Sequence, residues 1–135
     1  MVIEFNKLSD NVRTPEYNFA NDAGADVFMP SSYKMKKGEN VIPLGFSAII
    51  PSGYCALLCL RSSWMSKGLV CNHAPVDADY SGEWHLLVYN SGEEFELEKG
   101  DRICQIVILP IIQAQFIEPQ FINTRSSNGI GSTGK

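Results

Sequence analysis

Residues 40–60, NVIPLGFSAIIPSGYCALLCL, decide the fold class. Short aliphatic and aromatic segments alternate here with turn-forming residues at Pro43, at Gly45 and from Pro51 to Gly53. Short apolar segments bounded by Gly and Pro are typical of β-strands, because a helix needs a longer uninterrupted pattern. The stretch therefore predicts several strands joined by tight turns.

The same alternation continues toward the C-terminus. Further strand-like segments are EWHLLVYN at 83–90, FELEKGDRICQIVILPI at 95–111 and QFIEPQFI at 115–122. Strands that recur about every 8–12 residues, with turn signals between them, predict an all-β sandwich or barrel. The one helix that we expect is short, from Ser63 to Lys67, with Ser62 or Ser63 as its N-cap and Gly68 at its end.

The composition is that of an ordinary globular domain. The chain has 135 residues, 44% of them hydrophobic and 19% charged, which favours a single domain. The net charge of −4, from 11 Lys and Arg against 15 Asp and Glu, argues against a protein that binds nucleic acid through bulk electrostatics. We find no signal-peptide pattern and no apolar run of membrane-spanning length. We therefore expect a cytoplasmic protein, in the host-cell cytoplasm if the source is viral, with no membrane partner and no direct nucleic-acid partner.

The four cysteines are Cys55, Cys59, Cys71 and Cys104. Three of them lie inside apolar segments, where a thiol packs as a small hydrophobe, and we interpret them as reduced core thiols. A zinc site that adds His73 and His85 is the weaker alternative, because the Cys-x3-Cys spacing lacks a second paired cluster.

The last residues differ in composition from the rest. Residues 123–135, NTRSSNGIGSTGK, are rich in Gly, Ser and Thr, and Ile130 is almost the only apolar side chain among them. We expect a β-domain over residues 1–122, followed by a flexible arm over residues 123–135 that is mobile unless a ligand orders it.

Two carboxylates stand out in VDADYSGEW, residues 76–84. Asp-Tyr-Ser-Gly predicts a turn at 79–82, and a strand follows it. In an extended segment Asp77 and Asp79 share a face, and a partly sheltered carboxylate there can act as a general base toward water. The alternative is that both are solvent-exposed turn residues. Trp84 and His85 follow, and we interpret His85 as a core residue.

Two segments carry groups that suit an anion. In LRSSWMSKGL, residues 60–69, Arg61 and two serine hydroxyls stand at the end of a strand; the alternative is a simple helix cap beside a surface Arg. In RSSNGIGSTGK, residues 125–135, backbone N–H groups and hydroxyls can wrap phosphates, although the spacing is not that of a P-loop; the alternative is a disordered tail.

A third polar group lies in GDRICQIV, residues 100–107. Arg102 interrupts an apolar run and needs a partner such as Asp26 or Asp101, so a structural ion pair is the leading interpretation. Gln105 is either a satisfied core amide or a ligand contact.

The order of these segments is more specific than any one of them. AGADV (23–27), RSS…KGL (61–69), VDADYSG (76–82), GDRICQ (100–105) and RSSNGIGSTG (125–134) together resemble the five ordered motifs of the trimeric dUTPase family. The resemblance implies a jelly-roll, distorted β-barrel subunit in a three-fold homotrimer whose active sites are shared between chains. It implies hydrolysis of dUTP to dUMP and pyrophosphate, which limits uracil incorporation into DNA, with Mg²⁺ held by the substrate phosphates rather than by the protein.

The resemblance also assigns roles residue by residue. Asp77 would activate the water that attacks the α-phosphorus, Tyr80 would pack under the deoxyribose, and Asp79 would help to shape the hairpin. Backbone groups from Ala74 to Val76 would read the uracil. The phosphate contacts would be Arg61, Ser62, Ser63 and Gln105, with Arg125, Gly131, Ser132 and Thr133 from the arm. Asp26 and Arg102 would give structural or electrostatic support.

The sequence departs from the family pattern at two positions that face the base. Ile130 replaces an aromatic residue that stacks on uracil, and Pro75 removes a backbone donor from the base-reading hairpin. Three other interpretations remain. The first is a dCTP deaminase, for which Glu83 is the candidate base, or another deoxynucleotide hydrolase of the same fold. The second is a regulatory or binding homologue with weakened catalysis, and the third is a β-sandwich interaction module. The last leaves the arm glycines and the Asp77 hairpin unexplained.

Overall fold

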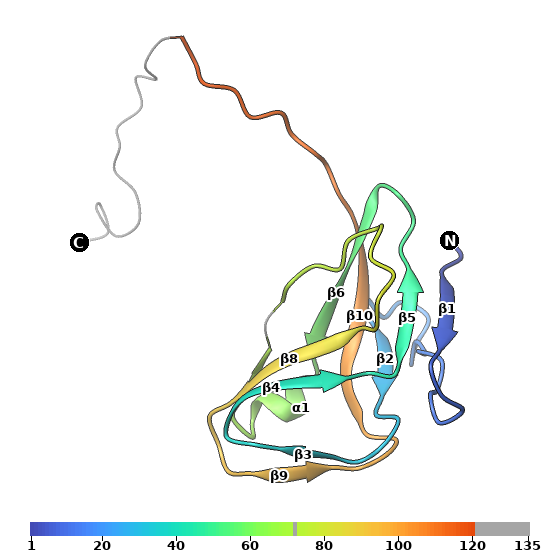
Figure 1. The fold of residues 1–135 in the computed structure, drawn as a ribbon, viewed down its shortest axis with the longest axis vertical. Coiled ribbons are helices and arrows are strands. Elements are labelled where there is room, and N and C mark those ends of the chain that lie inside the picture. Colours follow the sequence, from blue (N-terminus) through green and yellow to red (C-terminus); the bar gives the residue numbers. More distant parts are fainter. Residues whose placement is uncertain (72, 121–135) are drawn as a thin grey trace, which may run out of the picture.

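A computed structural model describes residues 1–71 and 73–120. This part of the chain forms ten strands and one helix of a single turn (Figure 1). In chain order the elements are β1 (Glu4–Lys7), β2 (Ala25–Phe28), β3 (Tyr33–Met35), β4 (Gly38–Pro43), β5 (Phe46–Ile49), β6 (Tyr54–Leu60), α1 (Ser62–Met65), β7 (Leu69–Cys71), β8 (His85–Asn90), β9 (Phe95–Leu97) and β10 (Arg102–Pro110). The predicted all-β class with one short helix is confirmed.

Every strand pair is antiparallel, and most pairs join strands that are distant in sequence. Two three-stranded sheets have the orders β2-β10-β6 and β4-β8-β7, and two-stranded sheets pair β1 with β5 and β3 with β9. This non-consecutive pairing is that of a jelly roll rather than of a simple meander. It places β2 beside β10, and so brings the first and the fourth sequence motif together.

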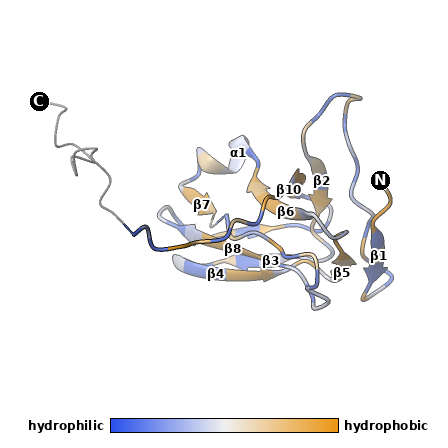
Figure 2. Cartoon of the chain, turned by 90° about the horizontal axis from the view of Figure 1, so that it is seen from above, coloured by the Kyte–Doolittle hydropathy of each residue, from blue (hydrophilic) through white to orange (hydrophobic). Residues whose placement is uncertain are grey.

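The core lies between the two three-stranded sheets. Strand β8 shows how it is built: Leu86, Val88 and Asn90 are buried, whereas the alternating residues His85, Leu87 and Tyr89 are exposed. Strands β6 and β10 are mostly hydrophobic in Figure 2, in contrast to β1. The largest fully buried side chains include Trp84, Phe46, Met35, Ile42, Leu44, Ile50, Leu86, Leu97 and Ile103.

The helix differs from its prediction at both ends. It spans Ser62–Met65, its N-cap residue is Arg61 in an extended conformation, and no side chain in the described part of the chain caps it. The predicted serine cap is therefore wrong, because both serines already lie inside the first turn. The helix also ends earlier than predicted, at Met65 rather than at Lys67. Gly68, with φ +94°, closes the turn that follows, and its N–H donates to the Met65 carbonyl at 3.0 Å.

The chain leaves the body of the domain after β10. Residues 111–120 form no strand and extend away from the sheets (Figure 1). Ile112 and Phe116 are 96% and 93% exposed. The strand predicted over 115–122 is therefore wrong for residues 115–120, and the arm residues Arg125, Ile130, Gly131, Ser132 and Thr133 lie outside the described part. Within that part, no helix has the length and apolar character that a membrane crossing requires.

Candidate active site

A buried carboxylate organises one end of the molecule. Asp26, on β2, is 4% exposed and faces Gln105 across the β2-β10 pairing. Its Oδ1 lies 3.8 Å from Arg61 Nε, and its Oδ2 lies 3.5 Å from Arg102 Nη1. Gln105 Nε2 donates to Oδ1 at 3.4 Å. The structure thus brings together four residues that the sequence analysis singled out. It confirms an ion pair for Arg102 and shows that, of the two partners left open, the partner is Asp26.

This cluster carries a net positive charge that points outward. One carboxylate is shared by two guanidinium groups, and the side chains of Arg61 and Arg102 are 34% and 40% exposed. Each guanidinium has five N–H donors in a fixed fork, so most of the donors remain available after the contact with Asp26. A buried anion that holds two partly exposed cations in place is suited to binding a phosphate chain.

The close approach of the Gly24 backbone to the Gln105 side chain fixes the position of Gln105. A Cβ added at Gly24 would lie 2.7 Å from the Gln105 Cβ and 2.8 Å from its Oε1. The glycine in the first motif is therefore needed so that the glutamine side chain can reach Asp26. The guanidinium carbon of Arg102 lies 5.7 Å from the centroid of the Phe28 ring, and that of Arg13 lies 3.9 Å from the same centroid. The contact between Arg13 and Phe28 is one that the sequence motifs did not indicate.

Thiols lie behind this cluster. Burial raises the pKa of Cys104, and the neighbouring Cys71 and Cys59 thiols and Asp26 act in the same direction. Burial likewise raises the pKa of Cys71, whose Sγ lies 3.5 Å from the Leu58 carbonyl oxygen. All four cysteines, each within the described residues, are thiols rather than disulfides. Cys71 and Cys104 are buried, and their raised pKa favours the protonated thiol, which is not the nucleophilic form.

The second group of candidate residues lies on the loop before β8. Val76 is tied to β6 by two hydrogen bonds, from Ala56 N to Val76 O at 3.1 Å and from Val76 N to Ala56 O at 2.8 Å. The turn follows at once, because Tyr80 N donates to the Asp77 carbonyl at 3.2 Å. The predicted turn at 79–82 is therefore two residues too late. Asp77 and Asp79 are not two positions of one extended strand, although both line one cavity with Ser52 and Gln113.

Asp77 is exposed in the single chain. Its carboxylate forms no hydrogen bond or ion pair with any of the described residues. A side chain that makes no structural contact, at the end of a segment fixed by two backbone bonds, is free to act on a ligand. Within a single chain, Asp77 also matches the alternative from the sequence analysis, which is a solvent-exposed turn residue.

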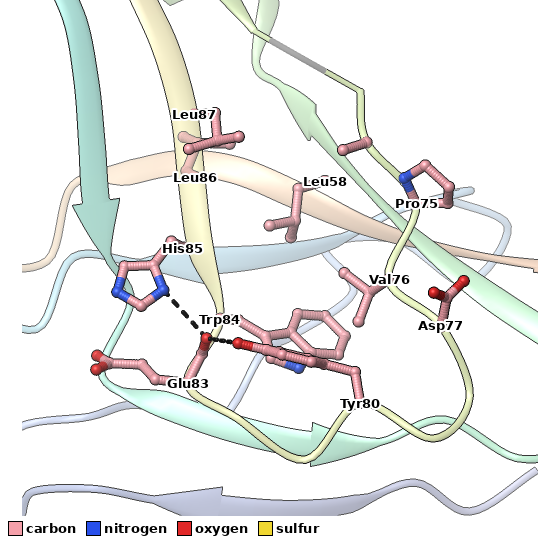
Figure 3. A pocket seen from close by; sticks show the side chains of 11 residues that line it. Leu58, Pro75, Val76, Asp77, Tyr80, Glu83, Trp84, His85, Leu86 and Leu87 are labelled. Carbon is pink, nitrogen blue, oxygen red and sulfur yellow. Dashed lines mark hydrogen bonds between the residues drawn. The ribbon is translucent and has the colours of Figure 1, made fainter.

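Tyr80 is held in a defined position beside Asp77. Its hydroxyl donates to the Glu83 carbonyl at 2.7 Å, and a Cβ at Gly82 would lie 2.6 Å from that hydroxyl oxygen. Figure 3 shows the ring reaching across the floor of a cavity of about 250 Å³. The cavity is lined by Leu58, Ala74, Pro75, Val76, Asp77, Tyr80, Glu83, Trp84, His85, Leu86 and Leu87. Gly82 is therefore needed for the ring to lie flat along the hairpin.

The backbone of residues 74–76 has few groups left for a ligand. Pro75 has no N–H, and the N–H of Val76 is already bound to Ala56. Ala74 is therefore the residue among these three whose N–H can donate to a heterocyclic base. Carbonyl oxygens, which have two lone pairs, remain able to accept a second bond.

Glu83 and His85 have other roles than those the sequence suggested. Glu83 Oε2 accepts a hydrogen bond from Gly45 N at 3.0 Å, which ties the hairpin to the β4–β5 turn. A carboxylate held in this way is a structural acceptor, and this argues against the deaminase interpretation. His85 is exposed, with Nδ1 3.1 Å from the Glu83 carbonyl oxygen, so its predicted place in the core is wrong. Trp84 is the core residue instead, and its ring packs on that of Phe46 with the centroids 5.3 Å apart.

The two groups of residues lie at opposite ends of β6. Val76 pairs with Ala56 near the start of the strand, whereas Arg61 directly follows its last residue, Leu60 (Figure 1). Five residues of extended chain separate Ala56 from Arg61, which is roughly 17 Å. One chain therefore does not bring Asp77 to the Asp26 cluster.

The donor groups at the Asp26 end of the molecule suit phosphate. Within residues 1–71 and 73–120, no group of three or more His, Cys, Asp or Glu side chains is placed to hold a metal ion. The predicted zinc alternative has no support in this part of the chain. The groups at the Asp26 end are guanidinium and hydroxyl groups, which bind anions.

The chain was compared with known proteins. The dUTPase family model matches residues 10–134. The deoxyuridine 5'-triphosphate nucleotidohydrolase of Zymomonas mobilis is 36% identical over 131 residues, which cover 92% of this chain and 90% of that protein. The dUTPase of Staphylococcus bacteriophage 80alpha, solved with dUPNHPP, superposes with a TM-score of 0.87 at 29% identity over 98% of both chains. A mutant dUTPase from phage phi11 of S. aureus, which coordinates a structural Mg(II) ion, has a TM-score of 0.83 at 25% identity over 90% of this chain and 98% of that one. The chain belongs to the dUTPase family.

Proposed function

We propose that the protein is a dUTP diphosphatase, which hydrolyses dUTP to dUMP and pyrophosphate and so keeps uracil out of DNA. The observation that carries this proposal is a cationic cluster on a buried aspartate combined with the Asp77 carboxylate, which has no hydrogen-bond or ion-pair partner among the described residues and lies beside a fixed tyrosine. The family membership supplies the substrate. A reaction on free nucleotides is consistent with a protein of the cytoplasm, or of the host-cell cytoplasm for a viral source.

Asp77 is the general base in this proposal. It takes a proton from the water that attacks the α-phosphorus, and pyrophosphate leaves from the opposite side. Its position is set by the two hydrogen bonds between Val76 and Ala56. Tyr80 packs under the deoxyribose, and Asp79 shapes the turn. Because the Tyr80 ring is pinned through its hydroxyl and by Gly82, it leaves little room for a 2′-hydroxyl, which predicts rejection of UTP.

The phosphate chain is bound by the Asp26 cluster. Arg61 and Gln105 contact it directly with the Ser62 and Ser63 hydroxyls, and Arg102 supports the cluster through Asp26. Arg125, Gly131, Ser132 and Thr133 of the arm over residues 123–135 close over the triphosphate, and Ile130 covers the uracil. The substrate phosphates would hold Mg²⁺, without dedicated protein ligands, and the ion would supply charge neutralisation there.

The active site is assembled from more than one chain, in a homotrimer. The separation of roughly 17 Å along β6 supports this, because Asp77 and Arg61 of one chain cannot reach the same phosphate group. An exposed apolar face of the β4-β8-β7 sheet also supports it. Val41, Val70 and Tyr89 are 57%, 62% and 53% exposed there, and Leu87 joins this face to the Tyr80 cavity.

Pyrophosphate release from dUTP, dTTP, dCTP and UTP, measured side by side with Mg²⁺, tests the proposal. We expect a strong preference for dUTP, because Ala74 offers the single free N–H of the 74–76 segment and Tyr80 excludes a ribose. Ammonia release from dCTP would instead favour the deaminase interpretation. No turnover of any of the four nucleotides by folded, oligomeric protein would favour the regulatory homologue.

A further inference from the structure

The segment that carries Arg61 has little to hold it in place by itself. Helix α1 has four residues, none of them buried, and no capping side chain among the described residues. A helical turn of this length is not stable alone, because the free energy that nucleates a helix exceeds the stabilisation from the hydrogen bonds of one turn. A phosphate site built on Arg61 and the following serines nevertheless needs a fixed backbone. The contacts of Trp64 supply it.

Trp64 fastens this segment to two other strands. Its indole Nε1–H donates to the Arg102 carbonyl at 2.7 Å, in a partly buried position. Its ring stacks on Phe95 of β9, with centroids 5.9 Å apart and an interplanar angle of 6°. The Lys67 ammonium lies 5.6 Å from the Trp64 ring and 4.9 Å from the Phe95 ring. One side chain therefore joins α1 to β10 by a hydrogen bond and to β9 by stacking.

The indole bond closes a loop of contacts around Asp26. Trp64 N donates to the Arg61 carbonyl at 3.0 Å, and Trp64 Nε1 binds the carbonyl of Arg102. The side chains of both arginines meet on Asp26. The backbones that carry the two guanidinium groups are thus linked on one side by the indole and on the other by the carboxylate.

We propose that Trp64 is a positioning residue of the phosphate site, which sets the distance between Arg61 and Arg102 without touching the nucleotide. The inference rests on the proposed function, since it assigns Trp64 to the triphosphate end of that site. Phe95 acts as the platform against which the indole is oriented. Loss of the indole N–H leaves the ring stacked, and it leaves the bond from Arg61 N to the Ile103 carbonyl oxygen, at 3.4 Å, as the backbone link from this segment to β10.

Trp64→Phe tests this directly, because phenylalanine keeps an aromatic ring on Phe95 and removes only the donor. We expect the inhibition constant of inorganic pyrophosphate and the KM for dUTP to rise about five-fold, in line with the loss of one hydrogen bond. The inhibition constant of deoxyuridine, which has no phosphate, is expected to stay within about two-fold. A general loss of structure would weaken both ligands, so the difference between them reports on positioning.

A second variant separates the hydrogen bond from the stacking. Phe95→Leu removes the platform and keeps the donor, and we expect a smaller change in the same direction for pyrophosphate alone. The inference is wrong if Trp64→Phe changes the pyrophosphate and deoxyuridine constants by the same factor, or changes neither. If the wild-type protein binds pyrophosphate but does not hydrolyse dUTP, the proposed function fails while the pyrophosphate comparison still decides the role of Trp64.

Discussion

Asp77→Asn is expected to lower kcat for dUTP about 10³-fold, because a positioned general base typically contributes between about 10² and 10⁴. The amide has nearly the shape of the carboxylate but cannot take a proton from water. The Asp77 side chain forms no hydrogen bond or ion pair within the described residues, so the substitution should leave the melting temperature unchanged. The affinity for dUPNHPP should also be retained, since binding depends on the cationic cluster.

Asp79→Asn is the matched control for this variant. Asp79 is also exposed, lies two residues away and lines the same cavity, so the change in charge and volume is the same. We expect its kcat to remain within a few-fold of the wild type. Near-normal turnover by Asp77→Asn, or an equal loss in Asp79→Asn, would remove Asp77 from the role of base.

Arg61→Ala is expected to reduce kcat/KM for dUTP about 100-fold, mainly through KM. Hydrogen bonds to charged groups are worth about 1.5–3 kcal/mol each, and a guanidinium group forms more than one with a phosphate. Stability should fall by less than about 1 kcal/mol, because the Arg61–Asp26 contact is long and one-third exposed and Arg102 still neutralises Asp26.

The control for this variant is Arg13→Ala, measured in the same steady-state assay. Arg13 pairs with Glu16 at 3.0 Å and covers Phe28, so its removal changes the net charge equally and disturbs the same neighbourhood. We expect kcat/KM to change less than about two-fold. Equal losses in the two variants would mean that Arg61 acts through the overall charge and not through contact with the phosphates.

The sequence predicts most of the strands for a simple physical reason. Turn-forming residues interrupt the apolar segments so often that only strands fit between them, and Gly68 closes the turn after the helix, where a positive φ is needed. The errors are equally local. The QFIEPQFI segment has strand-like composition, but a strand needs a partner, and residues 115–120 have none in the described chain. The sequence also predicts a core position for His85, but Trp84 is buried and the two-residue period of the strand turns His85 outward.

The features of the site that the sequence predicts are likewise local, whereas those that it does not predict depend on contacts between distant residues. The Arg102–Asp26 pair is predictable, because an arginine inside an apolar run needs a carboxylate. The bonds from Trp64 to Arg102 and from Gly45 to Glu83 each span 38 residues, and no local pattern indicates them. The distance between Asp77 and Arg61 is also invisible in the sequence, because motif order does not report which ends of the strands the motifs occupy.

Mixed oligomers of the two impaired variants give the most direct test that the site is shared between chains. Asp77→Asn and Arg61→Ala proteins are unfolded, combined in equal amounts and refolded together. Hydrolysis of dUTP, at a concentration well below the wild-type KM, is then compared with that of each variant refolded alone. Random assembly places an intact Asp77 from one chain beside an intact Arg61 from another in about a quarter of the sites. We therefore predict recovery to about a quarter of the wild-type activity. Activity no higher than that of the separate variants, in oligomers shown to be mixed, would mean that each site is built within one chain and would contradict the shared site.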